Sequence, residues 1–199
     1  MKTYLIAAFL ALGLAGCALP PVNRDSSIPL GGVATIEPTR YAGLWYEIAR
    51  YPNSFEENCF AVTAEYRQRQ DGRLDVINIC REGNVEGRER RALGRARIVD
   101  PETQAKLKVR FGLSPFEGDY WVLDRGVDYS WALVGEPGGR FLWILAREPA
   151  IADSLKADLV RRLQARGYNT EALYWTPQDA TAGRARRTFA VEPETAQTP

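Results

Sequence analysis

Lys106-Leu107-Lys108-Val109-Arg110-Phe111 is the most regular alternation of charged and apolar residues in this sequence. Successive side chains of a β-strand point to opposite faces of the sheet. We therefore expect the three cations to face solvent and Leu107, Val109 and Phe111 to face a core. The stretch predicts a β-strand over 106–111 with one face buried and the other in water.

Further short strands are predicted on both sides of this stretch. Turn signals such as Asp71-Gly72, Asp100-Pro101 and Gly138-Gly139 separate them. The eight expected strands are 45–51, 60–68, 74–79, 91–99, 106–111, 120–124, 129–135 and 141–146. No crossover helix is expected between them, so the strands are predicted to pair in antiparallel order.

The hydrophobic period changes after the eighth strand. Apolar residues now recur at steps of four, at Ile151, Leu155, Leu159 and Leu163. Pro149 before them and Gly167 after them are typical of helix ends, so one amphipathic helix is expected here. A short ninth strand is expected at 172–175.

This order of elements favours an all-β domain, an eight-stranded antiparallel up-and-down β-barrel with one C-terminal α-helix. Closure removes the unpaired strand edges that an open sheet exposes. A barrel of eight strands is also wide enough to hold one small ligand. The pattern alone permits a flat sandwich as the alternative.

The N-terminus has the parts of an export signal. A lysine precedes the apolar run 4–14, and Leu14-Ala15-Gly16-Cys17 follows as a cleavage site. Roughly a dozen apolar residues are too few to span a bilayer. The last four residues resemble the lipobox of bacterial lipoproteins, whose cysteine carries acyl chains that hold the protein on a membrane. This resemblance implies a signal peptide at 1–16, an acylated Cys17 and, because Ala18 is not Asp, a location at the outer membrane.

Three segments follow the signal peptide. Residues 17–34 are expected to form the acylated N-terminus and a tether rich in Pro, Gly and Ser. The barrel domain is expected at 35–176, and 177–199 lack apolar periodicity and are predicted to be disordered. With 26 basic and 25 acidic residues the formal charge is +1, which argues against a nucleic-acid partner. The sequence leaves a homodimer open.

The cysteines and the lack of histidine limit the chemistry. Cys17 is assigned to acylation, and the remaining Cys59 and Cys80 are expected to form a disulfide, as two thiols in an exported protein usually do. The sequence contains no histidine, which removes the usual general base and most zinc sites. We therefore predict no catalytic residue, no metal site and no cofactor.

Three sequence blocks resemble those of one protein family. Gly43-Leu44-Trp45 is similar to the Gly-x-Trp block that opens lipocalins, Asp128-Tyr129 to their second block, and the stretch that ends in Arg147 to their third. The resemblance covers about 35–176 and implies a lipocalin barrel. With both the lipobox and these blocks, the sequence is similar to the bacterial outer-membrane lipocalins and to the apolipoprotein D-like branch of the family.

The blocks are expected to serve the fold. Trp45 would close one end of the barrel, and Arg147 would lie across its indole as a cation–π partner. Asp128 and Tyr129 are expected to form a turn. Val127, where the family commonly has Thr, and the basic C-terminal tail are departures from the family pattern.

Strand alternation predicts which side chains face the barrel interior. Small residues at 92, 94 and 96 would leave space there, and a solid core is the alternative. The residues expected to contact a ligand are Glu47, Val62, Ala64, Tyr66, Val76, Asn78, Val109, Phe111, Tyr120, Trp131, Phe141 and Trp143. Leu133 and Leu145 are expected to share this inner face.

Charged groups near the interior have two interpretations each. Glu47 is a candidate buried carboxylate that, beside Tyr66 or Asn78, would bind either a ligand head group or its own neighbours. Arginines at 88, 90, 91, 95 and 97 would either attract anionic head groups or form a solvated strand face.

The resemblance and the apolar interior together predict a binding protein and not an enzyme. The expected function is the storage or transport of fatty acids, lysophospholipids or similar hydrophobic ligands at the outer membrane. Two alternatives are an isomerase that uses a cavity thiol at Cys80 and a structural envelope protein without a ligand.

Overall fold

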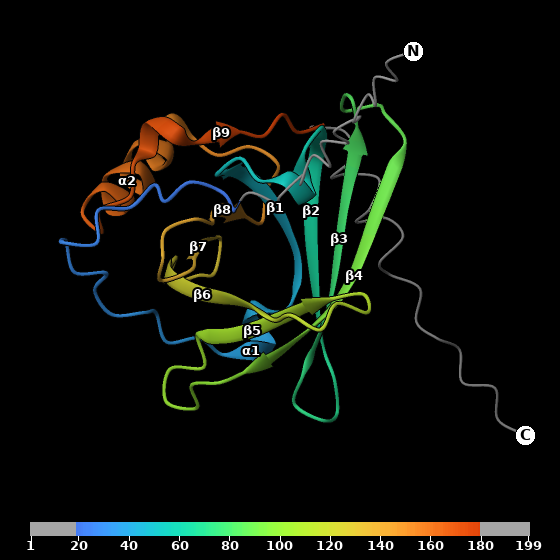
Figure 1. The fold of residues 1–199 in the computed structure, drawn as a ribbon, viewed down its shortest axis with the longest axis horizontal. Coiled ribbons are helices and arrows are strands. Elements are labelled where there is room, and N and C mark those ends of the chain that lie inside the picture. The colour runs from blue at the N-terminus through green and yellow to red at the C-terminus, as the bar shows by residue number, and fades with distance from the viewer. Residues whose placement is uncertain (1–18, 180–199) are drawn as a thin grey trace, which may run out of the picture.

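A computed structural model describes residues 19–179 (Figure 1). The predicted signal peptide 1–16, the predicted acylation site Cys17 and residues 180–199 of the predicted tail lie outside the described residues. The strands are β1 (Gly43–Arg50), β2 (Cys59–Gln68), β3 (Leu74–Glu82), β4 (Glu89–Ile98), β5 (Lys106–Phe111), β6 (Gly118–Arg125), β7 (Trp131–Gly135), β8 (Leu142–Ala146) and β9 (Tyr174–Trp175). The helices are α1 (Pro38–Tyr41) and α2 (Asp153–Gln164), with 3-10 turns η1 (Ser54–Glu56) and η2 (Thr170–Ala172).

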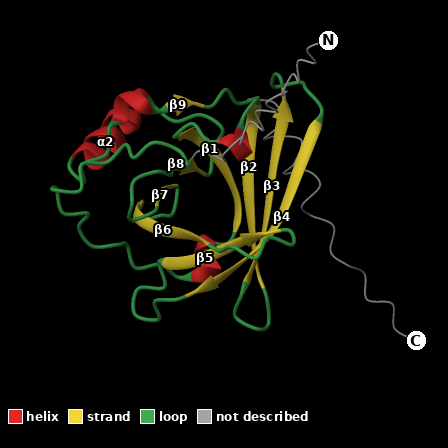
Figure 2. Cartoon of the chain, in the orientation of Figure 1, coloured by secondary structure: helices red, strands yellow, loops and turns green. Residues whose placement is uncertain are grey.

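These strands form one antiparallel sheet that closes on itself. Their order is β2-β3-β4-β5-β6-β7-β8-β1-β9, and β1 also pairs with β2, which closes the first eight strands into a barrel. The short β9 pairs with the end of β1. Figure 2 shows α2 outside the barrel and α1 at one of its ends. The predicted barrel with one C-terminal helix is confirmed, and the alternative of a flat sandwich is wrong.

The two ends of the barrel differ, because consecutive loops of an up-and-down barrel alternate between its ends. The loops at the end that α1 covers, the closed end, are 69–73, 99–105 and 126–130. The loops at the other end, the mouth, are 51–58, 83–88, 112–117 and 136–141. Two contacts between mouth loops agree with this assignment: the rings of Phe55 and Phe141 lie 5.6 Å apart, and the Gly83 N–H donates to the Asn58 carbonyl.

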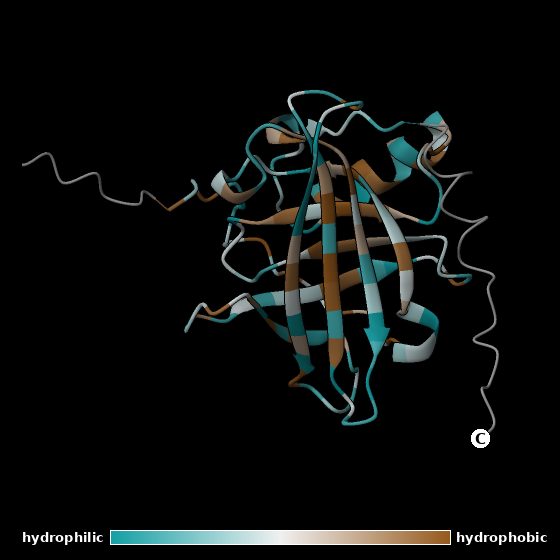
Figure 3. Ribbon diagram, turned by 90° about the vertical axis from the view of Figure 1, so that its right-hand side faces the viewer, coloured by the Kyte–Doolittle hydropathy of each residue, from teal (hydrophilic) through white to brown (hydrophobic). Residues whose placement is uncertain are grey.

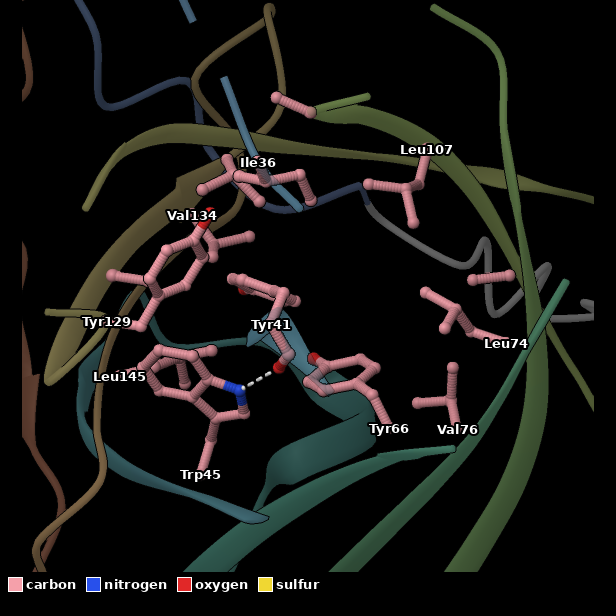
Figure 4. Close-up of a cluster of buried hydrophobic side chains, with 14 residues drawn as sticks. Ile36, Tyr41, Trp45, Tyr66, Leu74, Val76, Leu107, Tyr129, Val134 and Leu145 are labelled. Atoms are coloured by element: carbon pink, nitrogen blue, oxygen red, sulfur yellow. Dashed lines mark hydrogen bonds between the residues drawn. The ribbon is translucent and has the colours of Figure 1, made fainter. Parts of the chain in front are cut away.

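Apolar side chains pack on both sides of the sheet. Figure 3 shows polar and apolar residues alternating along the strands. An inner cluster around Tyr41, Trp45 and Leu145 fills the closed end (Figure 4). An outer cluster, which contains Ile144 and Leu159, lies between the sheet and α2. The wall beneath α2 is therefore buried on both of its faces.

The structure corrects the prediction for β7. Trp131 and Leu133 were expected to face the lumen, yet both belong to the outer cluster under α2. Ala132 and Val134 lie opposite Leu145 and Trp143 of β8, and directly opposed residues share one face of an antiparallel pair. The inner residues of β7 are therefore Ala132 and Val134. The prediction failed because every residue of this strand is buried, so its sequence does not alternate in polarity.

The predicted tether is also shorter than expected. The main chain at Asn23 and Asp25 donates to Gly139 and Gly167, and that at Ala34 donates to Val122. The Tyr51 hydroxyl donates to the Asn23 carbonyl at 2.9 Å. From residue 20 onward the segment predicted to be a free tether makes hydrogen bonds to the barrel.

The first residues of the predicted tail likewise contact the barrel. The Ala61 N–H donates to the Pro177 carbonyl. The Gln178 side chain donates to the main-chain carbonyls of Glu47 and Val62, at 2.6 and 3.0 Å. Residues 177 and 178 therefore extend the domain past the predicted boundary at 176.

Candidate ligand-binding site

The barrel encloses a cavity of about 410 Å³ that opens at the mouth. Its walls come from β1, β2, β3, β5, β6 and β8 and from the mouth loops. All the side chains predicted to contact a ligand line it except Trp131. They are Glu47, Val62, Ala64, Tyr66, Val76, Asn78, Val109, Phe111, Tyr120, Phe141 and Trp143. The interior is therefore hollow, and the alternative of a solid core is wrong.

Sequence reasoning missed several lining residues. They are Phe55, Glu56, Ser114, Phe116, Gly118 and Asp119. Most of them belong to the mouth loops, where side-chain direction does not follow the two-residue period of a strand. Aromatic residues in loops between predicted strands were the only signal for them in the sequence.

A second cavity of about 350 Å³ adjoins the lumen between β2, β3 and β4. It shares Phe55, Glu56 and Asn78 with the main cavity, and Arg90 and Arg91 also line it. Two of the predicted basic residues thus line a cavity that adjoins the lumen. The small side chain of Ala92 lines the same wall and leaves room there, as the sequence predicted.

The Cys59–Cys80 disulfide forms part of this second cavity and confirms the predicted pairing. The Cα atoms of the two cysteines lie 5.4 Å apart, and both side chains are buried. The Cys80 sulfur is bonded to Cys59 and is not a free thiol, so the alternative of a cavity-thiol isomerase loses its nucleophile.

The closed end is filled by Trp45, as predicted. Its indole N–H donates to the Tyr41 carbonyl at 2.8 Å (Figure 4), and the guanidinium of Arg147 lies 3.8 Å from the indole centroid. Gly43 begins β1 with a φ of 93°, where a Cβ would meet the Arg147 guanidinium at 3.4 Å. The first and third sequence blocks therefore contact each other in the fold.

The second block forms the predicted turn. The Asp128 carboxylate accepts hydrogen bonds from the N–H and hydroxyl of Ser130 at 3.0 and 2.7 Å. These bonds hold the pKa of Asp128 below its ordinary value. The Tyr129 hydroxyl accepts from the Glu37 N–H at 2.9 Å. The turn is therefore joined to the segment that precedes α1.

Three tyrosine hydroxyls meet at the inner end of the lumen. The Tyr120 oxygen lies 2.7 Å from that of Tyr41 and 2.8 Å from that of Tyr66. Burial raises the pKa of all three hydroxyls, so they are protonated at neutral pH. Two contacts among three hydroxyls use two protons and leave the third available. Because Tyr66 and Tyr120 line the lumen, this end can offer one neutral hydrogen-bond donor to a ligand.

A buried charge cluster lies on the β1 wall beside the mouth. Arg50 donates to the Glu47 carboxylate at 2.6 Å and to the Glu56 carbonyl at 2.8 Å, and its Nε lies 3.7 Å from the Glu56 carboxylate. The Thr176 hydroxyl also donates to Glu47. The Trp143 indole N–H donates to Glu56 at 3.1 Å. Two carboxylates therefore share a single guanidinium at the edge of an apolar cavity.

Glu47 is buried as predicted, but its partners are Arg50 and Thr176 and not Tyr66 or Asn78. A β-bulge between Glu47 and Ala49 shifts the register of β1 against β8. Residues three apart then share the inner face, which a regular strand does not allow. Burial and the nearby charge of Glu56 raise the pKa of Glu47 to about 8, and Arg50 opposes the rise. Glu47 therefore keeps its proton to higher pH than an exposed glutamate does.

Asn78 faces the same space from β3. Its side-chain oxygen is buried without a hydrogen-bond partner among residues 19–179. A hydrogen-bond donor on a ligand could bond to this oxygen without breaking an existing hydrogen bond.

Metal sites and membrane-spanning helices have no candidate among residues 19–179. Within residues 19–179, no group of three or more His, Cys, Asp or Glu residues is placed to hold a metal ion. In the same range, no helix has the length and apolar character needed to cross a membrane.

Comparison with known proteins matches this chain to a family model and to named relatives. A family model described as a lipocalin-like domain matches residues 36–178. The chain is 36% identical over 172 residues to the outer membrane lipoprotein Blc of Escherichia coli, covering 86% of this chain and 92% of that protein. It is 29% identical over 174 residues to apolipoprotein D of Mus musculus, covering 83% and 84%.

A solved structure shows the same fold. Insecticyanin from the tobacco hornworm Manduca sexta aligns with a TM-score of 0.60 at 20% identity, over 83% of this chain and 88% of that one. At this identity the likeness supports the fold alone. The family model covers most of the chain and coincides with the closed barrel and its three blocks, and this chain therefore belongs to the lipocalin family.

Proposed function

We propose that this protein binds a single hydrophobic ligand, a fatty acid, a lysophospholipid or a similar lipid, and stores or carries it in the cell envelope without transforming it. The observation that carries the proposal is the cavity of about 410 Å³ with mainly apolar walls. Its volume lies in the range of small-molecule sites. Each methylene that leaves water for this lumen contributes about 0.8 kcal/mol before the entropy of binding is subtracted.

The polar groups of the lumen support an amphiphilic ligand. Most of them lie at its two ends, with the tyrosine hydroxyls at the closed end and the Glu47, Arg50 and Glu56 cluster beside the mouth, and Asn78 faces the space between. Val62, Ala64 and Val109 line the apolar wall. An acyl chain would lie along this wall with its head group at the mouth.

A pair of tryptophan substitutions on β2 tests the lumen. Ala64→Trp would fill the cavity, and Arg67→Trp places the same tryptophan side chain at an exposed position of the strand. Delipidated Ala64→Trp should bind a fluorescent fatty acid at least about tenfold more weakly than the wild type, a loss of about 1.4 kcal/mol. Arg67→Trp should bind normally. Equal binding by all three proteins, or no binding by the wild type, would reject the proposal.

We further propose that the protein is held at the outer membrane by acyl chains on Cys17. The lipobox-like Leu14-Ala15-Gly16-Cys17 supports this, as does the identity of 36% with a protein named outer membrane lipoprotein Blc. Intact-mass measurement of the mature protein should show acylation at Cys17. Cys17→Ser should move the protein from the outer-membrane fraction to the soluble fraction, and a Cys17→Ser protein that stays on the membrane would contradict the anchor.

A further inference from the structure

The N-terminal segment begins its contact with the barrel at the mouth. The Asn23 N–H donates to the Gly139 carbonyl at 2.9 Å, and Arg140 donates to the Pro20 carbonyl at 2.6 Å. Gly139 has a φ of 75°, and a Cβ there would lie 2.2 Å from the Cβ of Arg24. Because no larger residue fits this approach, the segment is closely packed on mouth loop 136–141.

This contact limits the distance between the mouth and the proposed acyl anchor. Cys17 is three residues before Pro20. An extended chain advances at most 3.3–3.6 Å per residue, so the two residues can be no more than roughly 11 Å apart. An acylated Cys17 would therefore enter the bilayer close to mouth loop 136–141.

Exposed apolar side chains gather at the same end. Leu113 and Phe116 on mouth loop 112–117 are 102% and 81% exposed. Among the described residues, the large exposed apolar side chains of this end are Leu19, Val22, Phe55, Phe111, Leu113 and Phe116. Those of the closed end are Val99 and Val127. Exposed apolar groups concentrated in this way are typical of a protein or membrane contact.

We propose that the mouth of the barrel rests on the lipid bilayer, with Leu113 and Phe116 inserted among the acyl chains beside the anchor. The proposal relies on the acylation of Cys17 proposed above. Apolar insertion adds to the membrane affinity that the acyl chains of the anchor supply. Because Phe116 also lines the lumen, the apolar surface continues from the bilayer into the cavity. A lipid can then enter the lumen without crossing water.

Single-cysteine variants of the full acylated chain test this orientation. Leu113→Cys and Phe116→Cys would carry an environment-sensitive NBD label, and Val127→Cys, 88% exposed at the closed end, is the matched control. The label is selective because Cys59 and Cys80 are bonded to each other and the proposed acylation of Cys17 leaves no free thiol there. The proteins would be reconstituted on vesicles of phosphatidylethanolamine and phosphatidylglycerol.

Labels at 113 and 116 should shift their emission to the blue and be quenched by nitroxide-bearing lipids, while the label at 127 should do neither. Flotation of the protein with vesicles tests the acyl anchor separately from the orientation of the barrel. If the protein floats with vesicles but labels 113 and 116 report water, the orientation is wrong and the anchor stands. If the protein does not float, both the anchor and the orientation are rejected.

Two further measurements complete the test. A blue shift at 113 without vesicles that grows with protein concentration would show that a second copy covers the mouth, and would overturn the bilayer contact. Leu113→Asp should slow ligand transfer from vesicles at least about fivefold while affinity for fatty acid added in solution is kept. Val127→Asp should not change the transfer, and equal rates for the two variants would contradict the proposal.

Discussion

The guanidinium of Arg147 lies 3.8 Å from the centroid of the Trp45 indole. The same guanidinium donates to the main-chain carbonyls of Arg40, Ala42 and Leu44 at 2.8, 2.9 and 2.7 Å. One side chain just after β8 thus covers the indole and bonds carbonyls of α1, of β1 and of Ala42 between them. Arg147 joins the two parts of the chain that close the barrel.

Arg147→Ala should lower the free energy of unfolding by about 2–4 kcal/mol, because it removes the cation–π contact and leaves several carbonyls unpaired. Arg147→Lys should recover part of this loss, since an ammonium keeps the charge but cannot reach the carbonyls with a planar fork. Urea unfolding measures both. Arg161→Ala, which removes an exposed ion pair on α2, is the control, and an equal effect of the two alanine variants would contradict the role of Arg147.

The Cys59–Cys80 bond should stabilise the domain by about 3 kcal/mol, because it closes a short loop in the unfolded chain. The double variant Cys59→Ser, Cys80→Ser should therefore unfold at a lower urea concentration than the oxidised wild type. Reduction of the wild type should have the same effect on its unfolding midpoint. Thiol counting in denaturant should find neither cysteine reactive before reduction, and a reactive thiol at position 80 would revive the isomerase alternative.

The buried Glu47 should make stability fall as the pH rises. Its pKa is raised from 4.5 to about 8 in the fold, so between these values the native state holds a proton that the unfolded state has lost. The free energy of unfolding should then decrease with pH by at most about 1.4 kcal/mol per unit. The stabilisation that comes from the raised pKa of Glu47 is complete below the pKa that Glu47 has in the unfolded chain. It is lost by about pH 8.

Glu47→Gln should flatten this slope between pH 5 and 8, measured by urea unfolding at several pH values. Asp128, whose pKa is lowered by its bonds to Ser130, titrates below this window and does not mask the effect. A variant whose slope equals that of the wild type would show that Glu47 is ionised in the native state.

Trp131 and Trp143 should differ in their effects, because they lie on opposite sides of the sheet. Trp131 packs in the outer cluster, and the Arg162 guanidinium of α2 lies 5.3 Å from its ring. Trp131→Ala should cost about 3–5 kcal/mol of stability through the cavity it leaves, with ligand affinity unchanged. Trp143→Ala should weaken fatty-acid binding, since Trp143 lines the lumen. Weaker binding by folded Trp131→Ala would contradict the outward placement.

Much of the barrel could be predicted from the sequence alone. Where one strand face is wet, as at Lys106 to Phe111, polarity alternates with the two-residue period and assigns each side chain to a face. The contact between Trp45 and Arg147 could be expected from the family blocks, and the Cys59–Cys80 pair from the cysteine count. These features depend on local periodicity or on a short list of possible partners.

Tertiary structure decided the rest. Both faces of β7 are apolar because α2 covers the outside, so only the pairing of Ala132 with Leu145 could reveal that Trp131 points outward. The bulge after Glu47 places Arg50 opposite Trp143, on the same face of the sheet as Glu47, although strand alternation assigns residues three apart to opposite faces. The contact between Pro20 and Arg140 joins residues 120 positions apart, and it brings the N-terminal segment to the mouth. Such features arise when distant segments bury each other's surface, and no local pattern in the sequence predicts them.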